Sequence, residues 1–130
     1  MWGDLDSLGI VFYPRYYEWI DACGHLFFEA IGLHMGALWR DRKMAFGLAG
    51  TSCRYFKPGR YHQQIRIATT IDAIGEKTVL LKHAIRLSAD EGLLVEGFEE
   101  RICLDVSAAE HFRAVQIPAD IYGILKAAAE

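Results

Sequence analysis

Apolar positions near the start of the chain recur at helical spacing. Between residues 13 and 31 they fall every three or four positions, which places them on one face of a helix. They are Tyr13, Tyr17, Ile20, Gly24, Phe27 and Ile31. Pro14 suits the first turn, because the backbone N–H groups there have no acceptor within the helix and proline lacks this N–H. Gly32 follows the last apolar position and is the residue type that most readily ends a helix. The pattern predicts a helix of about five turns.

From residue 44 to residue 105 the spacing changes to the alternation that is typical of β-strands. The clearest run is 65–71, in which every second position carries a β-branched residue: Ile65, Ile67, Thr69 and Ile71. The other runs are 50–57, 79–87 and 93–104. Turn-forming sequences separate them at 57–59, 75–77 and 90–92. Because the strands follow one another through short turns, we expect a mainly antiparallel sheet.

The order of these elements favours one architecture. After the strands, Pro118 predicts the start of a short alanine-rich helix over 119–129. One long helix cannot cover a sheet of this size unless the sheet wraps around it. With 130 residues, we expect a single domain that spans 1–130. The predicted fold class is α+β, with a curled antiparallel sheet around one long central helix and a short C-terminal helix.

Composition and charge exclude several classes of protein. Hydrophobic residues make up 52% of the chain and charged residues 24%, which is typical of a globular domain. The net charge of -3 and the lack of a basic run argue against nucleic acid as a partner. No apolar run has the length of a membrane span, and the first residues do not resemble a signal peptide. We therefore expect a cytoplasmic protein without a membrane partner.

The residues that usually bind cofactors are not arranged for that purpose. The chain has three cysteines, Cys23, Cys53 and Cys103, which are widely spaced and form no CxxC pair. We expect reduced thiols. The five histidines lack metal-binding spacing, and neither a phosphate loop nor a G-x-S-x-G nucleophile motif is present. We expect no metal and no organic cofactor.

The opening segment carries the most specific signal. Residues 2–16 read W-G-D-L-D-S-L-G-I-V-F-Y-P-R-Y. This segment resembles the signature of the 4-hydroxybenzoyl-CoA thioesterase family, roughly G-D-x-D-x-x-G-I-V-x-Y-P-x-Y. The agreement is ungapped and continues through 19–22, and the segments 112–115 and 117–120 resemble the family's C-terminal region. The resemblance implies a hotdog fold and hydrolysis of an acyl-coenzyme A thioester. It also implies dimers or homotetramers with active sites at subunit boundaries.

Two departures from the family pattern limit what the resemblance implies. Family members usually have a few more residues before the Trp-Gly-Asp segment, so we expect a first strand that is short or missing. Leu48 stands where a hydroxyl-bearing residue would help to bind a ring hydroxyl. An aromatic acyl group is favoured, but short-chain and branched acyl groups also suit an apolar pocket.

The resemblance assigns the chemistry to the opening loop and the start of the helix. Asp6 matches the family's catalytic carboxylate, either as nucleophile or as general base. From spacing alone, Asp6 would be interpreted as a turn or helix cap. Asp4 is the neighbouring competitor, and we interpret it as organising the loop. The backbone N–H of Tyr13 is the expected oxyanion donor, since amides at a helix N-terminus stabilise negative charge. Gly9 would let the backbone approach the substrate closely.

The remaining candidates concern the two ends of the substrate. The acyl pocket is expected to involve Phe12, Tyr13, Tyr16, Trp19 and Asp21, although core packing is an alternative for each aromatic residue. Asp21 either contacts a polar group on an aromatic acyl ring or makes a structural ion pair or hydrogen bond. The expected contacts to the coenzyme A phosphates are Lys77, Thr78 and Arg113. The alternative for these residues is an ordinary solvated surface.

Two other functions would use the same pocket. A hydroxyacyl thioester dehydratase with this fold commonly uses a catalytic histidine, and the loop around Asp6 contains none. A non-catalytic acyl-coenzyme A binding protein would need the pocket but not Asp6. The sequence therefore favours a thioesterase whose partners are its acyl-coenzyme A substrate and further copies of the same chain.

Overall fold

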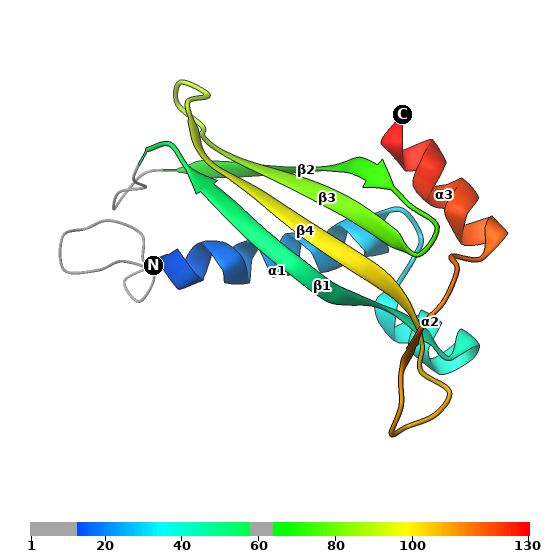
Figure 1. The fold of residues 1–130 in the computed structure, drawn as a ribbon. Helices are drawn as coiled ribbons and strands as arrows, with labels where there is room; N and C mark the ends of the chain where they lie inside the picture. The colour runs from blue at the N-terminus through cyan, green and yellow to red at the C-terminus, as the bar shows by residue number, and fades with distance from the viewer. Residues whose placement is uncertain (1–12, 58–63) are drawn as a thin grey trace.

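The structure is a computed structural model that describes residues 13–57 and 64–130, with side chains from residue 19 onward. It contains three helices and five strands within these ranges (Figure 1). In chain order they are α1 (Tyr13–Ala30), α2 (Met35–Arg42), β1 (Met44–Tyr55), β2 (Ile65–Ile74), β3 (Thr78–Leu87), β4 (Leu93–Asp105), β5 (Arg113–Ala114) and α3 (Ala119–Ala129). Among the described residues, no helix combines the length and the apolar character that crossing a membrane requires.

The strands form one antiparallel sheet that curls over α1. Their order is β1-β4-β3-β2, and β5 pairs with the end of β4. Figure 1 shows α1 running along the concave side of the sheet, with α2 and α3 at the end where α1 finishes. The predicted arrangement of a curled antiparallel sheet around one long helix is confirmed. The predicted C-terminal helix is also confirmed, with the expected bounds.

The core consists of two apolar clusters that lie one after the other along α1. In the first, Ile20 packs with Ile85 and Val95. In the second, Phe28 packs with Val79, as well as with Leu81 and Cys103. Because β3 begins near Val79 and ends near Ile85, the start of α1 lies over the end of β3. The two ends of α1 therefore face opposite ends of the sheet.

The buried face of α1 differs slightly from the predicted one. Ile20, Gly24 and Phe28 are buried and follow each other at steps of four residues, whereas Phe27 is only partly buried. Phe27, which belongs to the predicted face, packs against the core, and the fully buried aromatic residue is its neighbour Phe28, which the predicted face did not include. Side chains at both three and four residues after Gly24 lie near the same face of a helix, so spacing alone could not choose between them.

The end of α1 follows the prediction, and the helix after it was not predicted. Gly32 has a φ of 91°, in the left-handed region that favours glycine. The eight-residue α2 follows, and its N-terminus is capped by His34, whose Nδ1 accepts from the Ala37 amide at 3.2 Å. Histidine is not among the residues that usually cap helices, and α2 lacks a clear apolar face, so neither of the usual signs of a helix is present in this segment.

A β-bulge in β1 decides which of its side chains face α1. The pairing with β4 shifts between Leu48 and Gly50. Leu48 lies opposite Arg101, and Thr51 lies opposite Glu99. Directly opposed residues in an antiparallel pair point to the same face of the sheet. The bulge therefore keeps Leu48 and Thr51 on the same face, although they are three positions apart.

Candidate functional site

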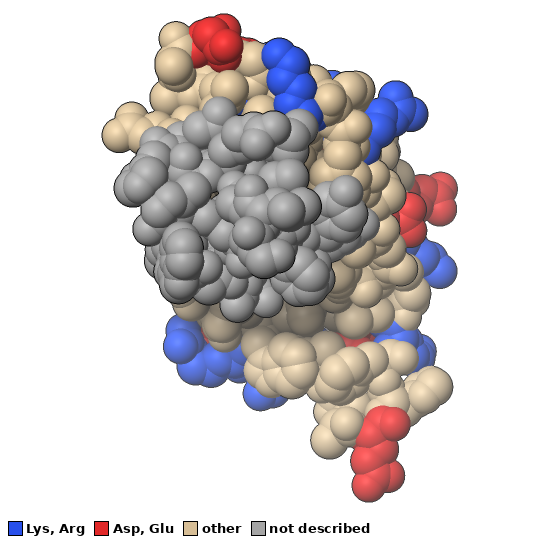
Figure 2. All heavy atoms as spheres, turned by 90° about the vertical axis from the view of Figure 1, so that its left-hand side faces the viewer, with Lys and Arg blue, Asp and Glu red and all other residues tan. Residues whose placement is uncertain are grey.

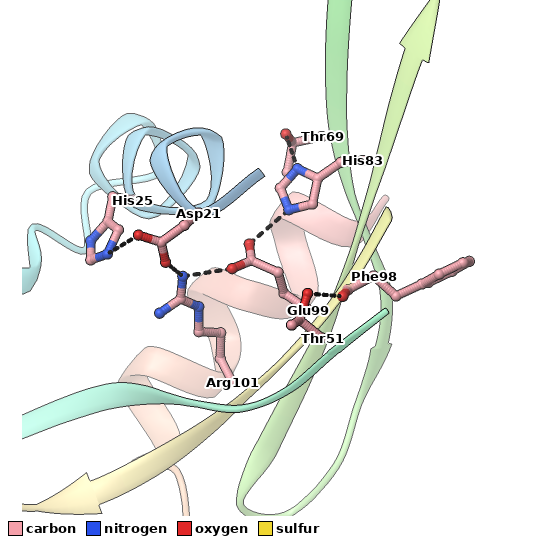
Figure 3. Close-up of polar contacts among 8 residues, drawn as sticks. All are labelled: Asp21, His25, Thr51, Thr69, His83, Phe98, Glu99 and Arg101. Carbon is pink, nitrogen blue, oxygen red and sulfur yellow. Dashed lines mark hydrogen bonds and ion pairs between the residues drawn. The ribbon is translucent and has the colours of Figure 1, made fainter. Parts of the chain in front are cut away.

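A chain of polar side chains crosses the interior between the sheet and α1 (Figure 3). It starts on β2, where Thr69 Oγ1 lies 2.8 Å from His83 Nδ1 on β3. His83 Nε2 lies 2.7 Å from Glu99 Oε1 on β4. Arg101 Nη2 then donates to both Glu99 Oε2 and Asp21 Oδ1, each at 2.7 Å. We call these five residues the polar network.

The polar network is buried at the sheet and open at the helix. His83 is 0% exposed, Glu99 1% and Arg101 3%. The Asp21 side chain is 51% exposed, and its Oδ2 lies 3.7 Å from Nε2 of His25, one turn further along α1. The single guanidinium therefore lies between a buried and a half-exposed carboxylate. Of the charged members of the network, Asp21 is the one that a ligand can reach without moving the core.

The polar network was missed in the sequence, although β4 contains a signal for it. Glu99, Glu100 and Arg101 follow one another and resemble a solvated charge run. The structure shows instead that Glu99 and Arg101 alternate with outward-facing residues, in line with the buried Val95 and Cys103. Charged residues on the apolar face of a strand are the sign that could have indicated a buried ion pair.

Gly24 leaves the space that Glu99 occupies beneath α1. A Cβ at Gly24 would overlap Glu99 Oε1 and would lie 3.3 Å from Arg101 Nη2. We therefore expect Gly24→Ala to destabilise the protein by about 1–3 kcal/mol, as overpacking of a core does. The matched control is Gly123→Ala in α3, where nothing lies within 4 Å of the new Cβ.

Urea unfolding of the two alanine variants provides the measurement. Gly123→Ala should stabilise the protein by about 0.5–1 kcal/mol, because alanine has the higher helix propensity. A gain in stability of Gly24→Ala similar to that of Gly123→Ala would contradict the close approach of α1 to Glu99.

The predicted site residues fall into three groups. Asp6, Gly9 and Phe12 lie outside the described residues. Tyr13 is the first residue of α1, and the backbone of Tyr16 lies in its first turn. The remaining candidates, Trp19, Asp21, Lys77, Thr78 and Arg113, are all described, and Trp19 is partly buried against the core cluster around Ile20. Asp21 joins the polar network through its ion pair with Arg101, which is one of the two interpretations of this residue, and its contact with the substrate stays a prediction.

Asp21 and Leu48 are both neighbours of Arg101. Arg101 binds Asp21 on α1, and Leu48 is its direct neighbour across the β1–β4 ladder. Leu48 is 47% exposed, which is unusual for leucine on a face that carries the core helix. The structure thus brings one exposed carboxylate and one exposed apolar side chain to the same part of the molecule.

The three predicted coenzyme A contacts lie together at the end of the sheet where α1 finishes. The Cys103 amide donates to the Lys77 carbonyl oxygen at 2.7 Å, and Thr78 is the first residue of β3. Arg113 lies opposite Asp105, two positions further along β4 than Cys103. A groove of about 740 Å³ runs beside them. Its lining consists of Ile74, Gly75, Glu76, Gln116, Ile117, Ala119 and Tyr122.

The guanidinium of Arg113 has a fixed partner in Asp105. Arg113 Nη2 donates to Asp105 Oδ2 at 3.1 Å, and both the hydroxyl and the amide of Ser107 donate to Asp105 Oδ1, at 2.6 and 2.9 Å. These hydrogen bonds, chiefly that from the Ser107 hydroxyl, lower the pKa of Asp105 from 3.8 to about 2. The Asp105 carboxylate therefore joins the two ends of the loop between β4 and β5, and it stays ionised in mild acid.

Acid should weaken this loop in a defined pH range. The folded-state pKa of Asp105 lies below its unfolded value, so its contribution to stability is complete above that unfolded value, near pH 4. We expect the contribution to disappear as the pH falls from about 4 to about 2. Asp105→Asn should remove this part of the pH dependence of the free energy of unfolding. An unchanged slope in that variant would contradict the assignment.

The start of α1 and the candidate coenzyme A contacts lie far apart in one chain. α1 has 18 residues, so at about 1.5 Å per residue it spans about 27 Å. Tyr13 is at its beginning, whereas the start of β3, which follows Lys77, lies near its end, because Phe28 packs with Val79 and Cys103. Arg113 pairs with Asp105, two positions after Cys103 on β4. Figure 2 faces the end where α1 begins and shows acidic and basic side chains interspersed around the margin of that face. The described side chains there provide no large area of one charge.

Comparison with known proteins identifies the family. The model of the thioesterase superfamily matches residues 8–93, which is more than half of the chain. The 4-hydroxybenzoyl-CoA thioesterase of Pseudomonas sp. (strain CBS-3) is 29% identical over 126 residues, which cover 91% of this chain and 86% of that protein.

Solved structures confirm the fold. The structure of the Pseudomonas enzyme has a TM-score of 0.84 at 25% identity and covers 95% of this chain and 92% of that chain. A gentisyl-coenzyme A thioesterase has a TM-score of 0.79 at 27% identity and covers 95% of this chain and 93% of that chain. The predicted hotdog fold and the predicted family are thus confirmed. The chain belongs to the thioesterase superfamily and is a thioester hydrolase with the hotdog fold.

Proposed function

We propose that this protein hydrolyses an acyl-coenzyme A thioester to the free acid and coenzyme A, with Asp6 as the catalytic carboxylate. The observation that carries the proposal is that α1 begins at Tyr13, directly after the motif that contains Asp6. The first amides of a helix have no intrahelical acceptors and stabilise a developing oxyanion. Asp6 either attacks the carbonyl carbon or takes a proton from the water molecule that attacks it, and in both routes the C–S bond breaks and the thiolate of coenzyme A leaves. In the first route water then hydrolyses the mixed anhydride with Asp6 and releases the free acid.

We further propose that each active site combines residues of two or more subunits, in a dimer or tetramer. The thioester carbonyl has to meet Asp6 and the Tyr13 amide, and the phosphates of coenzyme A need cations such as Lys77 and Arg113. Within one chain these groups lie at opposite ends of a helix of about 27 Å. The separation supports a site in which the phosphates are bound by a different subunit from the one that supplies Asp6.

The acyl group that we propose is aromatic and carries a hydrogen-bond donor. The half-exposed carboxylate of Asp21 supports the donor, because a buried or partly buried acceptor gains most from a partner that satisfies it. The exposed Leu48 nearby supports an apolar ring. The two relatives named above act on 4-hydroxybenzoyl and gentisyl thioesters of coenzyme A, which is consistent with an aromatic acyl group.

Thiol release from a panel of esters tests the proposal. The panel contains benzoyl, hydroxybenzoyl, acetyl and medium-chain thioesters of coenzyme A, and a thiol reagent reports the product. We expect the fastest release from an aromatic ester. Binding of the esters without thiol release would instead support the acyl-coenzyme A binding protein. Hydration or dehydration of the acyl chain without thiol release would support the dehydratase.

A further inference from the structure

We infer that Arg101 is a positioning residue that holds Asp21 in place for a hydrogen-bond donor on the acyl group. This inference rests on the proposed function and deepens it. Arg101 itself is buried beneath α1 and acts through Asp21, its partner on the helix. The residue that would contact the substrate is Asp21.

The hydrogen bonds of the polar network fix the direction of the Asp21 carboxylate. Nη2 of Arg101 carries two hydrogens, and Asp21 Oδ1 and Glu99 Oε2 each lie 2.7 Å from it. The other oxygen of Glu99 is bound to His83, and the other ring nitrogen of His83 is bound to Thr69. The three inner members, His83, Glu99 and Arg101, are therefore each held on two sides, and the chain of contacts ends at Asp21 Oδ1.

The second oxygen of Asp21 remains able to accept a hydrogen bond. Oδ2 lies 3.7 Å from His25 Nε2, which is too long for a hydrogen bond. An ionised carboxylate offers about four lone-pair sites, so the bond to Arg101 does not use up its capacity. Figure 3 shows the carboxylate between Arg101 and His25, at the end of the network farthest from Thr69. The O–H of a phenol or the N–H of an amine is the type of donor that would bind Oδ2 of Asp21.

Fold stability alone does not account for three buried polar side chains at this place. Burying ionised groups costs several kcal/mol each, and apolar residues of similar volume often hold a core equally well or better. Arg101 Nε is also buried and has no hydrogen-bond partner among the described residues, which adds to the cost. A rigid support for a binding carboxylate is a role that apolar residues could not take over.

The test compares how well each variant distinguishes two ligands. The ligands are thioether analogues of hydroxybenzoyl- and benzoyl-coenzyme A, which bind without being hydrolysed. The ratio of their dissociation constants measures the preference for the donor. Hydrogen bonds to charged groups account for about 10- to 100-fold in binding. We expect Arg101→Lys and Asp21→Asn each to reduce the wild-type preference by about that factor, and the double variant to reduce it no further.

Two more variants make the test independent of folding. Asp21→Glu keeps the charge at a half-exposed position but moves it by one methylene, and it should also reduce the preference at least tenfold. Arg40→Gln breaks an exposed pair with Asp41 that does not touch the polar network, and it should keep the preference. Fluorescence or circular dichroism confirms that each variant is folded.

The outcomes separate the inference from the proposed function. No preference in the wild-type protein, or an unchanged preference in Arg101→Lys or Asp21→Glu, would overturn the positioning role. Equal weakening of both ligands would assign Arg101 a merely structural role and would overturn it as well. The proposed function fails separately, if the corresponding thioesters bind but release no thiol.

Discussion

Asp6→Asn should reduce thiol release from the preferred acyl-coenzyme A ester by two or more orders of magnitude. A catalytic acid or base contributes roughly 10²- to 10⁴-fold, and an amide can neither attack the carbonyl carbon nor take a proton from water. The isosteric change should leave the unfolding midpoint close to that of the wild type. The measurement is kcat/KM with the best ester of the panel, together with urea unfolding.

The neighbouring carboxylate provides a matched control for this result. Asp4 lies two residues before Asp6 in the same motif, and we interpret it as organising the loop. Asp4→Asn should therefore lower kcat/KM by less than tenfold. If Asp4→Asn has the larger effect, the catalytic role belongs to Asp4. If neither variant loses activity, the carboxylate mechanism is wrong.

Glu99→Leu should reduce the free energy of unfolding by about 3–5 kcal/mol. Glu99 accepts from both Arg101 and His83 at 2.7 Å, so the substitution removes a buried partner from each of them at once. An uncompensated buried charge is one of the largest single sources of destabilisation in proteins. Typical domains are stable by only 5–15 kcal/mol, so this loss is large, and urea unfolding measures it.

The next residue along β4 is the control, since it has the same charge on the opposite face. Glu100 is exposed, so Glu100→Leu should change stability by no more than about 0.5 kcal/mol. A combined replacement of His83, Glu99 and Arg101 by apolar residues should recover most of the loss. A mild effect of Glu99→Leu alone would indicate that water or a rearranged Asp21 compensates Arg101.

Regular periodicity explains why most of the fold could be predicted. The apolar spacing after Pro14 indicated α1, and the β-branched residues at every second position of 65–71 indicated β2. α2 has only eight residues and an unusual histidine cap, and β5 has only two residues, so neither is long enough to show a period. Such short segments are recognised only from the elements on which they pack, and periodicity along the chain does not show that packing.

The candidate site was predictable where it follows a local motif and not where it depends on tertiary contacts. The motif around Asp6 is continuous in the sequence, and it indicated the family. Asp21 allowed two interpretations, because its partner Arg101 is 80 residues away along the chain. Local charge order even pointed away from burial at Glu99 and Arg101. Only the curl of the sheet over α1 brings these residues together.

The length of α1 has a genetic consequence if active sites are shared between subunits. A chain that lacks Asp6 loses a residue that precedes α1 in the sequence, and a chain that lacks Arg113 loses a residue paired with the end of β4, near which α1 finishes. Coexpressed in one cell, two such inactive alleles could assemble oligomers in which some sites receive an intact residue from each parent. Two lesions on one allele would not complement each other in this way. Two inactive alleles that restore activity together would then carry lesions near opposite ends of α1, and two that do not would carry lesions near the same end.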